Sequence, residues 1–124
     1  MKSRNLAESF RFAFAGLWYA LRTQRNARIH LCFAAGAIAL GVWLGLSATQ
    51  WAVLVLTIGF VLASEMLNTV AESLVDLLSP GYHPLAKVIK DVTAGAVLLS
   101  AITAVIVGLV IFGPLLWNKL VRGD

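Results

Sequence analysis

Four polar side chains recur at helical spacing inside an otherwise apolar stretch of the chain: Glu65, Asn68, Glu72 and Asp76. At 100° per residue they fall within an arc of about 80° on one face of a helix. A carboxylate inside a membrane costs roughly 2.5–3.5 kcal/mol, so such a stripe is normally tolerated only where it serves a site. Because three carboxylates also repel one another, the stripe predicts a cationic partner, either a metal ion or basic side chains.

The residue types of the stripe suit phosphoryl transfer. Mg²⁺ takes oxygen ligands and usually arrives with phosphate oxygens. Lys90 and Asp91 open the next apolar segment, and a lysine there can contact phosphate and offset the acidic face. The combination predicts a metal on carboxylates, a lysine on phosphate and one carboxylate as general base. The sequence contains no Walker A motif, no protein-kinase glycine-rich loop and no Cys/His cluster for zinc.

A function of another class also fits buried acids in a small membrane protein. A proton or cation pathway, formed by several copies around a central pore, uses the same residue types. The Lys90–Asp91 pair and the polar segment Gly81-Tyr82-His83 favour a nucleotide over a pore.

The composition around these residues is that of an integral membrane protein. The chain of 124 residues is 60% hydrophobic and 13% charged, whereas a soluble domain is about 25% charged. This excludes a disordered chain and a disulfide-stapled module, and the length predicts a single domain over 1–124. The net charge of +4 comes without any nucleic-acid-reading motif, so no nucleic-acid partner is expected.

Hydropathy predicts an all-α membrane protein with one surface helix and three spans. A bilayer core of roughly 30 Å takes about 20 helical residues. Residues 1–28 alternate apolar and charged positions with the helical period, which is typical of a helix lying in the membrane interface. The predicted spans are about 29–47, 52–78 and 85–112.

The predicted ends of the spans rest on turn signals. Residues 48–51 are expected to form a short turn, residues 79–84 to form a loop, and Gly113-Pro114 to end the last span. Asp76 then lies near the water boundary, Glu72 one turn deeper, and Glu65 about two turns deeper still.

The distribution of basic residues predicts the orientation. Eight Lys and Arg residues accompany the N-terminal segment and the 79–91 segment, against two near the C-terminus. Because basic residues favour the cytoplasmic side, the N-terminus and the 79–84 loop are expected in the cytoplasm, in a multi-pass protein of the bacterial inner or plasma membrane.

Several motifs resemble those of a known family, the small bacterial lipid kinases of the prokaryotic diacylglycerol kinase and undecaprenol kinase type. The matching blocks are Ser9-Phe10, Ala13-Phe14, Gly16-Leu17, Arg25-Asn26, Arg28-Ile29-His30-Leu31, the segment 65–72 with Asp76, and the segment 90–97. The resemblance implies a homotrimer of three-span subunits with sites shared between neighbours, and transfer of the ATP γ-phosphoryl group to a lipid hydroxyl with Mg²⁺ bound.

The resemblance also implies roles for single residues. Glu65 matches the general base of the family, Asn68 an active-site amide and Glu72 a metal ligand, while Gln24 stands where the family usually has a metal-binding glutamate. The candidate ATP-binding residues are Gly81, Tyr82, His83, Lys90, Asp91, Glu72 and Asp76. The candidate lipid-binding residues are Ser9, Ala13, Phe14 and Glu65.

The substrate expected from the resemblance is undecaprenol. The Arg25-Asn26-Ala27-Arg28-Ile29-His30 block and the Ala13-Phe14 stretch look more like the Gram-positive and cyanobacterial branch, in which undecaprenol is a frequent substrate. Diacylglycerol is the alternative.

Overall fold

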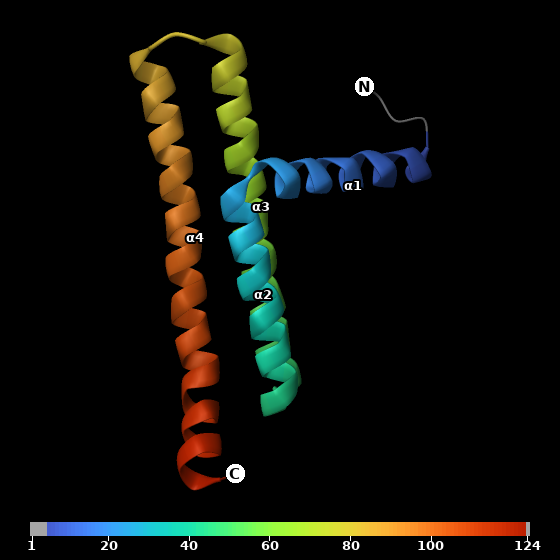
Figure 1. Ribbon diagram of the computed structural model, residues 1–124, viewed down its shortest axis with the longest axis vertical. Helices are drawn as coiled ribbons and strands as arrows, with labels where there is room; N and C mark the ends of the chain where they lie inside the picture. The colour runs from blue at the N-terminus through green and yellow to red at the C-terminus, as the bar shows by residue number, and fades with distance from the viewer. Residues whose placement is uncertain (1–4, 124) are drawn as a thin grey trace.

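The computed structural model describes residues 5–123, which form helices joined by short connections. The elements are α1 (Leu6–Thr23), α2 (Arg25–Leu44), α3 (Ala48–Leu78), α4 (Pro84–Trp117) and a short π-helical turn (Asn118–Arg122). Helices α2, α3 and α4 are each long and apolar enough to cross a membrane. Helix α1 extends sideways from the start of α2 (Figure 1). The predicted all-α membrane architecture is confirmed. Residues 1–4 of the predicted first helix lie outside the described range.

The boundary between the first two helices lies at Gln24, so the prediction of a helix over 1–28 was wrong at its end. Gln24 has extended backbone angles (φ −110°, ψ 113°), although its N–H still bonds to Ala20 O. Arg28 stabilises the break, because its Nη1 donates to the carbonyls of Leu21 at 3.0 Å and Arg22 at 2.9 Å. These carbonyls at the end of α1 have no partner within their own helix. Nothing in local propensity marks this position, since it carries neither Gly nor Pro.

The connection between α2 and α3 is shorter than predicted. Gly45 ends α2 in the left-handed conformation (φ 73°), which glycine adopts without steric cost. Helix α3 then begins at Ala48 with a capping box: Ser47 Oγ accepts from Gln50 N–H, and Gln50 Oε1 accepts from Ser47 N–H. The prediction of a turn over 48–51 was therefore wrong, because this capping pair starts the helix there.

The last helix is longer than predicted. His83 caps α4, its Nδ1 accepting from Leu85 N–H at 3.1 Å. The helix continues through Pro114 to Trp117, so the prediction that Gly113-Pro114 ends it was wrong. Proline removes one backbone donor, and local adjustment of the hydrogen bonds lets membrane helices tolerate that loss.

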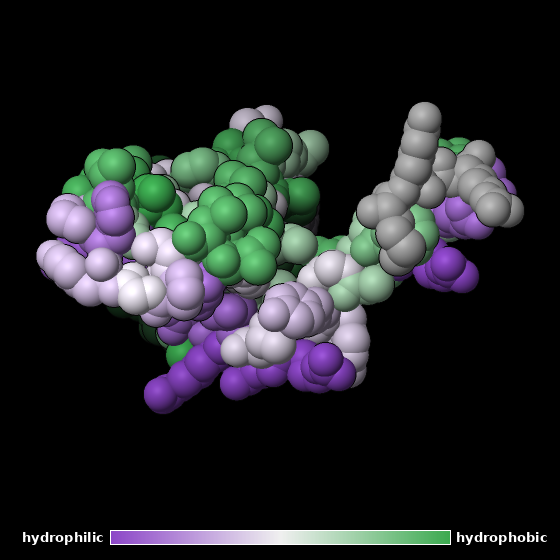
Figure 2. All heavy atoms as spheres, turned by 90° about the horizontal axis from the view of Figure 1, so that it is seen from above, coloured by the Kyte–Doolittle hydropathy of each residue, from purple (hydrophilic) through white to green (hydrophobic). Residues whose placement is uncertain are grey.

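Helices α3 and α4 form an antiparallel hairpin that projects beyond the level of α1 on its loop side (Figure 1). At the opposite end, Leu46, Leu54, Ile111 and Phe112 form the buried apolar cluster that ties the three long helices together. Large apolar side chains elsewhere on these helices are exposed. Seen from the loop end, hydrophilic side chains gather along one side of the molecule, and apolar ones cover much of the rest (Figure 2). Such a surface requires lipid or neighbouring chains.

Candidate functional site

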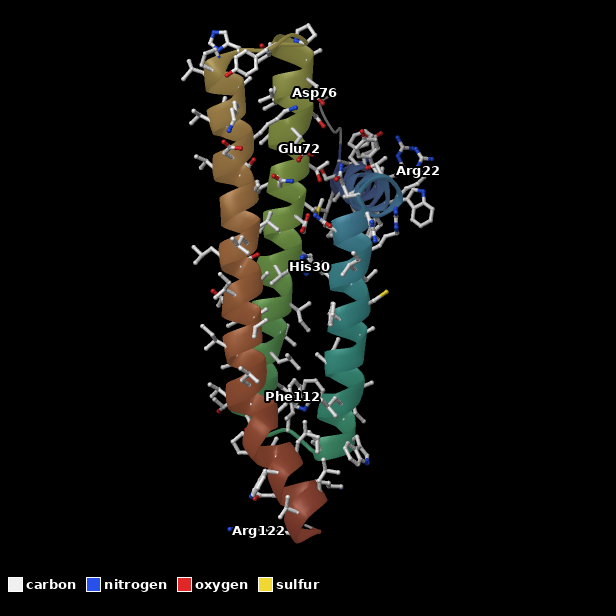
Figure 3. All side chains as sticks on the ribbon, turned by 60° about the vertical axis from the view of Figure 1, so that its left-hand side comes forward. Arg22, His30, Glu72, Asp76, Phe112 and Arg122 are labelled. Carbon is white, nitrogen blue, oxygen red and sulfur yellow. The ribbon has the colours of Figure 1, made fainter. Side chains whose placement is uncertain are left out.

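Helix α3 carries the polar stripe from the buried part of the bundle to the exposed end of the hairpin. The side chain of Glu65 is 3% exposed and that of Asp76 is 70% exposed. Asn68 and Glu72 between them are partly buried. In Figure 3, Asp76 lies beyond the level of α1, Glu72 lies near it, and His30 lies on the other side of it. The exposure of the side chains therefore increases along the stripe from Glu65 to Asp76.

The deepest carboxylate meets a histidine of another helix. His30 Nε2 on α2 lies 3.2 Å from Glu65 Oε1 on α3. The imidazole is not aligned for a hydrogen bond, so Glu65 Oε1 is buried without a hydrogen-bond partner among residues 5–123. Sequence reasoning did not include His30 among the site residues. The feature of the sequence that could have indicated His30 is its position, because it is an ionisable side chain near the start of an apolar span.

The middle of the stripe is held together by an amide–carboxylate contact. Asn68 Nδ2 donates to Glu72 Oε1 at 3.3 Å, and Asn68 Oδ1 is buried without a partner in the described part of the chain. The neighbouring hydroxyls of Thr69 and Ser73 donate to backbone carbonyls four residues earlier. Their hydrogens are therefore used by the helix itself, and the free oxygens in the middle of the stripe belong to Asn68 and Glu72.

At the exposed end, the stripe meets a lysine of α4. Lys90 Nζ lies 3.0 Å from Asp76 Oδ1, with 47% and 70% of the two side chains exposed. One turn away, Lys87 and Asp91 form a second exposed pair at 2.6 Å within α4. The stripe thus has basic partners at both ends, His30 at the buried end and Lys90 at the exposed end.

The loop before α4 makes no hydrogen bond or ion pair with the stripe within the described residues. The side chain of Tyr82 is exposed, His83 serves as the cap of α4, and Gly81 O accepts from Ser79 Oγ at 3.3 Å. These candidate residues lie beside the Asp76–Lys90 pair in the sequence of the hairpin, at its water-facing end.

Helix α1 carries the candidate lipid-binding residues Ser9, Ala13 and Phe14. Ser9 Oγ donates to Asn5 O, and Phe14 is exposed. A groove of about 330 Å³ separates α1 from α3, and its lining from α1 consists of Gly16, Tyr19 and Ala20. Ser9, Ala13 and Phe14 do not line this groove, whose α3 side is a face next to the stripe and not the stripe itself.

Gln24 stands at the junction of α1 and α2, where it ends one helix and precedes the next. Its side chain does not cap α2. No contact joins it to Glu72 within the described residues.

A second, larger groove of about 720 Å³ runs between α2, α3 and α4. It extends from His30 to Phe112, and its lining is almost wholly apolar. Small residues make the space, among them Ala34, Gly36, Ala37, Ala101, Ala104 and Gly108. The groove therefore reaches the level of the His30–Glu65 contact from within the membrane-spanning part.

The donor atoms of the stripe fit a hard divalent cation only in part. No group of three or more His, Cys, Asp and Glu side chains gathers within residues 5–123. The Glu72 carboxylate and the unpartnered Asn68 Oδ1 are nevertheless the oxygen donors that Mg²⁺ prefers. Mg²⁺ commonly keeps waters and phosphate oxygens as further ligands and takes only one or two carboxylates from the protein, of which Glu72 is a candidate.

Comparison with known proteins gives a consistent picture. A sequence profile described as prokaryotic diacylglycerol kinase matches residues 11–112. A protein of Synechocystis sp. (strain ATCC 27184 / PCC 6803 / Kazusa) named diacylglycerol kinase is 53% identical over 105 residues, 84% of this chain and 60% of that protein. The undecaprenol kinase of Bacillus subtilis (strain 168) is 41% identical over 107 residues, 86% of this chain and 87% of that protein. The diacylglycerol kinase of Escherichia coli (strain K12) is 33% identical over 82 residues, 66% of this chain and 64% of that protein.

Proposed function

Since the chain belongs to the prokaryotic diacylglycerol kinase family, we propose that it transfers the γ-phosphoryl group of ATP to the hydroxyl of a membrane lipid alcohol. The observation that carries this proposal is the stripe of α3. One helix face leads from a buried carboxylate to an exposed ion pair near the loop end of the hairpin. A lipid hydroxyl and a soluble nucleotide approach from those two directions.

The chemistry follows from the depth of each residue. Glu65 takes the proton from the lipid hydroxyl as that oxygen bonds to the γ-phosphorus, and the bond from phosphorus to the bridging oxygen of ADP breaks. Lys90 contacts the phosphates, with Asp91, Asp76 and the Gly81-Tyr82-His83 loop as further nucleotide contacts at the same end. Their exposure leaves them accessible to a ligand arriving from water.

Glu72 is the principal metal ligand in this proposal. Asn68, which donates to it, contributes its free Oδ1, and Gln24 adds a neutral amide oxygen. A Mg²⁺ ion held by these residues would supply positive charge to offset the charge on the phosphoryl oxygens.

Self-association completes the site in this proposal. Within residues 5–123, no hydrogen bond or ion pair joins the loop or Gln24 to the stripe. The exposed apolar faces and the groove rich in small residues are suited to close packing of helices from other copies. We expect a homotrimer in which neighbouring chains share sites. Cross-linking and native mass measurement in detergent test this, and a fully active monomer contradicts it.

The proposed orientation has α1 at the cytoplasmic interface of the bacterial plasma or inner membrane. The arginines of the α1–α2 junction and the lysines at the start of α4 then lie on the cytoplasmic side, where ATP is present. Cysteine accessibility from the two sides of intact vesicles tests the orientation at an introduced Ser79→Cys, with the natural Cys32 replaced by serine.

The proposed lipid is undecaprenol, supported by the N-terminal motifs and by the match over 87% of the Bacillus subtilis undecaprenol kinase. Diacylglycerol is the second candidate, because the Synechocystis relative with 53% identity carries that name. The purified chain in mixed micelles is given radiolabelled ATP with undecaprenol and a diacylglycerol at equal mole fraction, and the products are separated. Faster labelling of undecaprenol is expected. Preference for diacylglycerol overturns the choice of lipid, and no lipid labelling overturns the kinase proposal.

A further inference from the structure

We propose that His30 is a positioning residue for the Glu65 carboxylate, acting through an N–H donated from Nε2 to Glu65 Oε1. The inference rests on the proposed role of Glu65 as the base. The two atoms lie 3.2 Å apart across the α2–α3 contact, with the labelled imidazole directed from α2 toward α3 (Figure 3). This is a hydrogen-bond distance, and the proposed bond requires the imidazole to turn so that its N–H is aligned with Oε1.

Several polar side chains on the helices around Glu65 already have partners of their own within the described residues. On α3, Glu72 is a like charge that already accepts from Asn68. On α2, the Nη1 of Arg28 is committed to two carbonyls of α1. On α4, Lys90 pairs with Asp76 and Lys87 pairs with Asp91 at the exposed end.

A buried carboxylate needs such a donor, because an uncompensated charge at low dielectric is costly. The side chain of Glu65 is 3% exposed and that of His30 is 22% exposed. The Ser100 hydroxyl of α4 is also buried, and it donates to Val97 O of its own helix. Its hydrogen is therefore not available to Glu65.

The donated hydrogen bond has a specific consequence for the reaction. With Oε1 held by His30, the plane of the carboxylate is set and Oε2 is the oxygen left to take the proton from the lipid hydroxyl. A base misplaced by about 1 Å can lose roughly 10²-fold in rate, so the holding residue affects turnover more than binding.

The test compares two amides that differ in reach. In His30→Gln the amide nitrogen occupies the position of the histidine Nε2, whereas in His30→Asn it occupies that of Nδ1 and falls short of Glu65. We expect His30→Gln to retain kcat within a few-fold and His30→Asn to lose kcat by about 10–100-fold, with the KM values for lipid and ATP little changed. Leu31→Ala, the next residue of α2, lines neither groove and serves as the matched control.

A double-mutant cycle separates this role from a general effect on packing. If His30 acts through Glu65, His30→Asn causes no further loss in a Glu65→Gln background. Equal loss in His30→Gln and His30→Asn overturns the donor role, and additive losses in the cycle overturn action through Glu65. If Glu65→Gln alone has normal turnover, the proposed base fails. If Glu65→Gln is impaired while His30→Asn has normal kcat, only the positioning inference fails.

Discussion

The His30–Glu65 contact and the Asp76–Lys90 contact both join α3 to a neighbouring helix, at 3.2 Å and 3.0 Å. Their surroundings differ more than their lengths. The Glu65 side chain is 3% exposed, whereas that of Asp76 is 70% exposed. Water and salt weaken the exposed pair to about 0–1 kcal/mol, while a buried carboxylate depends strongly on its partner.

This difference divides one helix face into two kinds of site. The exposed lysine can leave Asp76 at little cost and turn to a phosphate group, which suits the exchange of a soluble nucleotide. The buried carboxylate has few alternative partners, which suits a fixed position next to a lipid hydroxyl. The following changes are expected to act unequally on the two ends of the stripe.

The largest effect is expected at the buried end. Glu65→Gln removes the proton acceptor while keeping the shape of the side chain, and general-base catalysis contributes about 10²–10⁴-fold. We expect kcat to fall by that order and ATP binding to stay close to normal, measured by lipid phosphorylation and by binding of a fluorescent ATP analogue. Near-normal turnover would remove Glu65 from the role of base.

A smaller effect of a different kind is expected at the exposed end. Lys90→Ala removes a charged donor to phosphate, worth about 1.5–3 kcal/mol, so the KM for ATP should rise by roughly 10–100-fold. Because the site is exposed, this difference should shrink as ionic strength rises. A rise in the KM for lipid with an unchanged KM for ATP would assign Lys90 to the wrong substrate.

Between the two ends, Gln24→Glu adds a charge to the proposed metal site. A carboxylate attracts Mg²⁺ more strongly than an amide, so the Mg²⁺ concentration for half-maximal activity should fall several-fold. Gln24→Asn, which stays neutral, is the control. An unchanged Mg²⁺ titration in the glutamate variant means that Gln24 does not face the metal.

The smallest effect is expected for the exposed pair within α4. Lys87→Ala removes the i,i+4 pair with Asp91, and such a pair contributes about 0.3–0.5 kcal/mol. The free energy of unfolding in detergent should fall by no more than that, and the KM for ATP should stay unchanged. Lys87→Ala is thus the matched control for Lys90→Ala, and equal effects of both on ATP would contradict a specific role for Lys90.

Much of the fold could be predicted because its signals are local. An uncharged stretch of about 20 residues predicts a span, and a stripe at helical spacing predicts one polar face. The helix boundaries were harder. The Ser47–Gln50 capping box is visible in the sequence, but the prediction divided it between the end of the first span and the turn over 48–51. The break at Gln24 depends on Arg28, which reaches back over the end of α1.

The sequence by itself determined the three apolar spans, the amphipathic first helix and the placement of Glu65, Glu72 and Asp76 in order along one helix face. These depend on hydropathy and on the 3.6-residue period, which are properties of one segment at a time. Only the tertiary structure decided that His30 meets Glu65 and that Lys90 meets Asp76. Each contact depends on how far one helix is rotated and shifted against another. The packing of whole helix faces sets that arrangement, and the local sequence around either residue does not predict it.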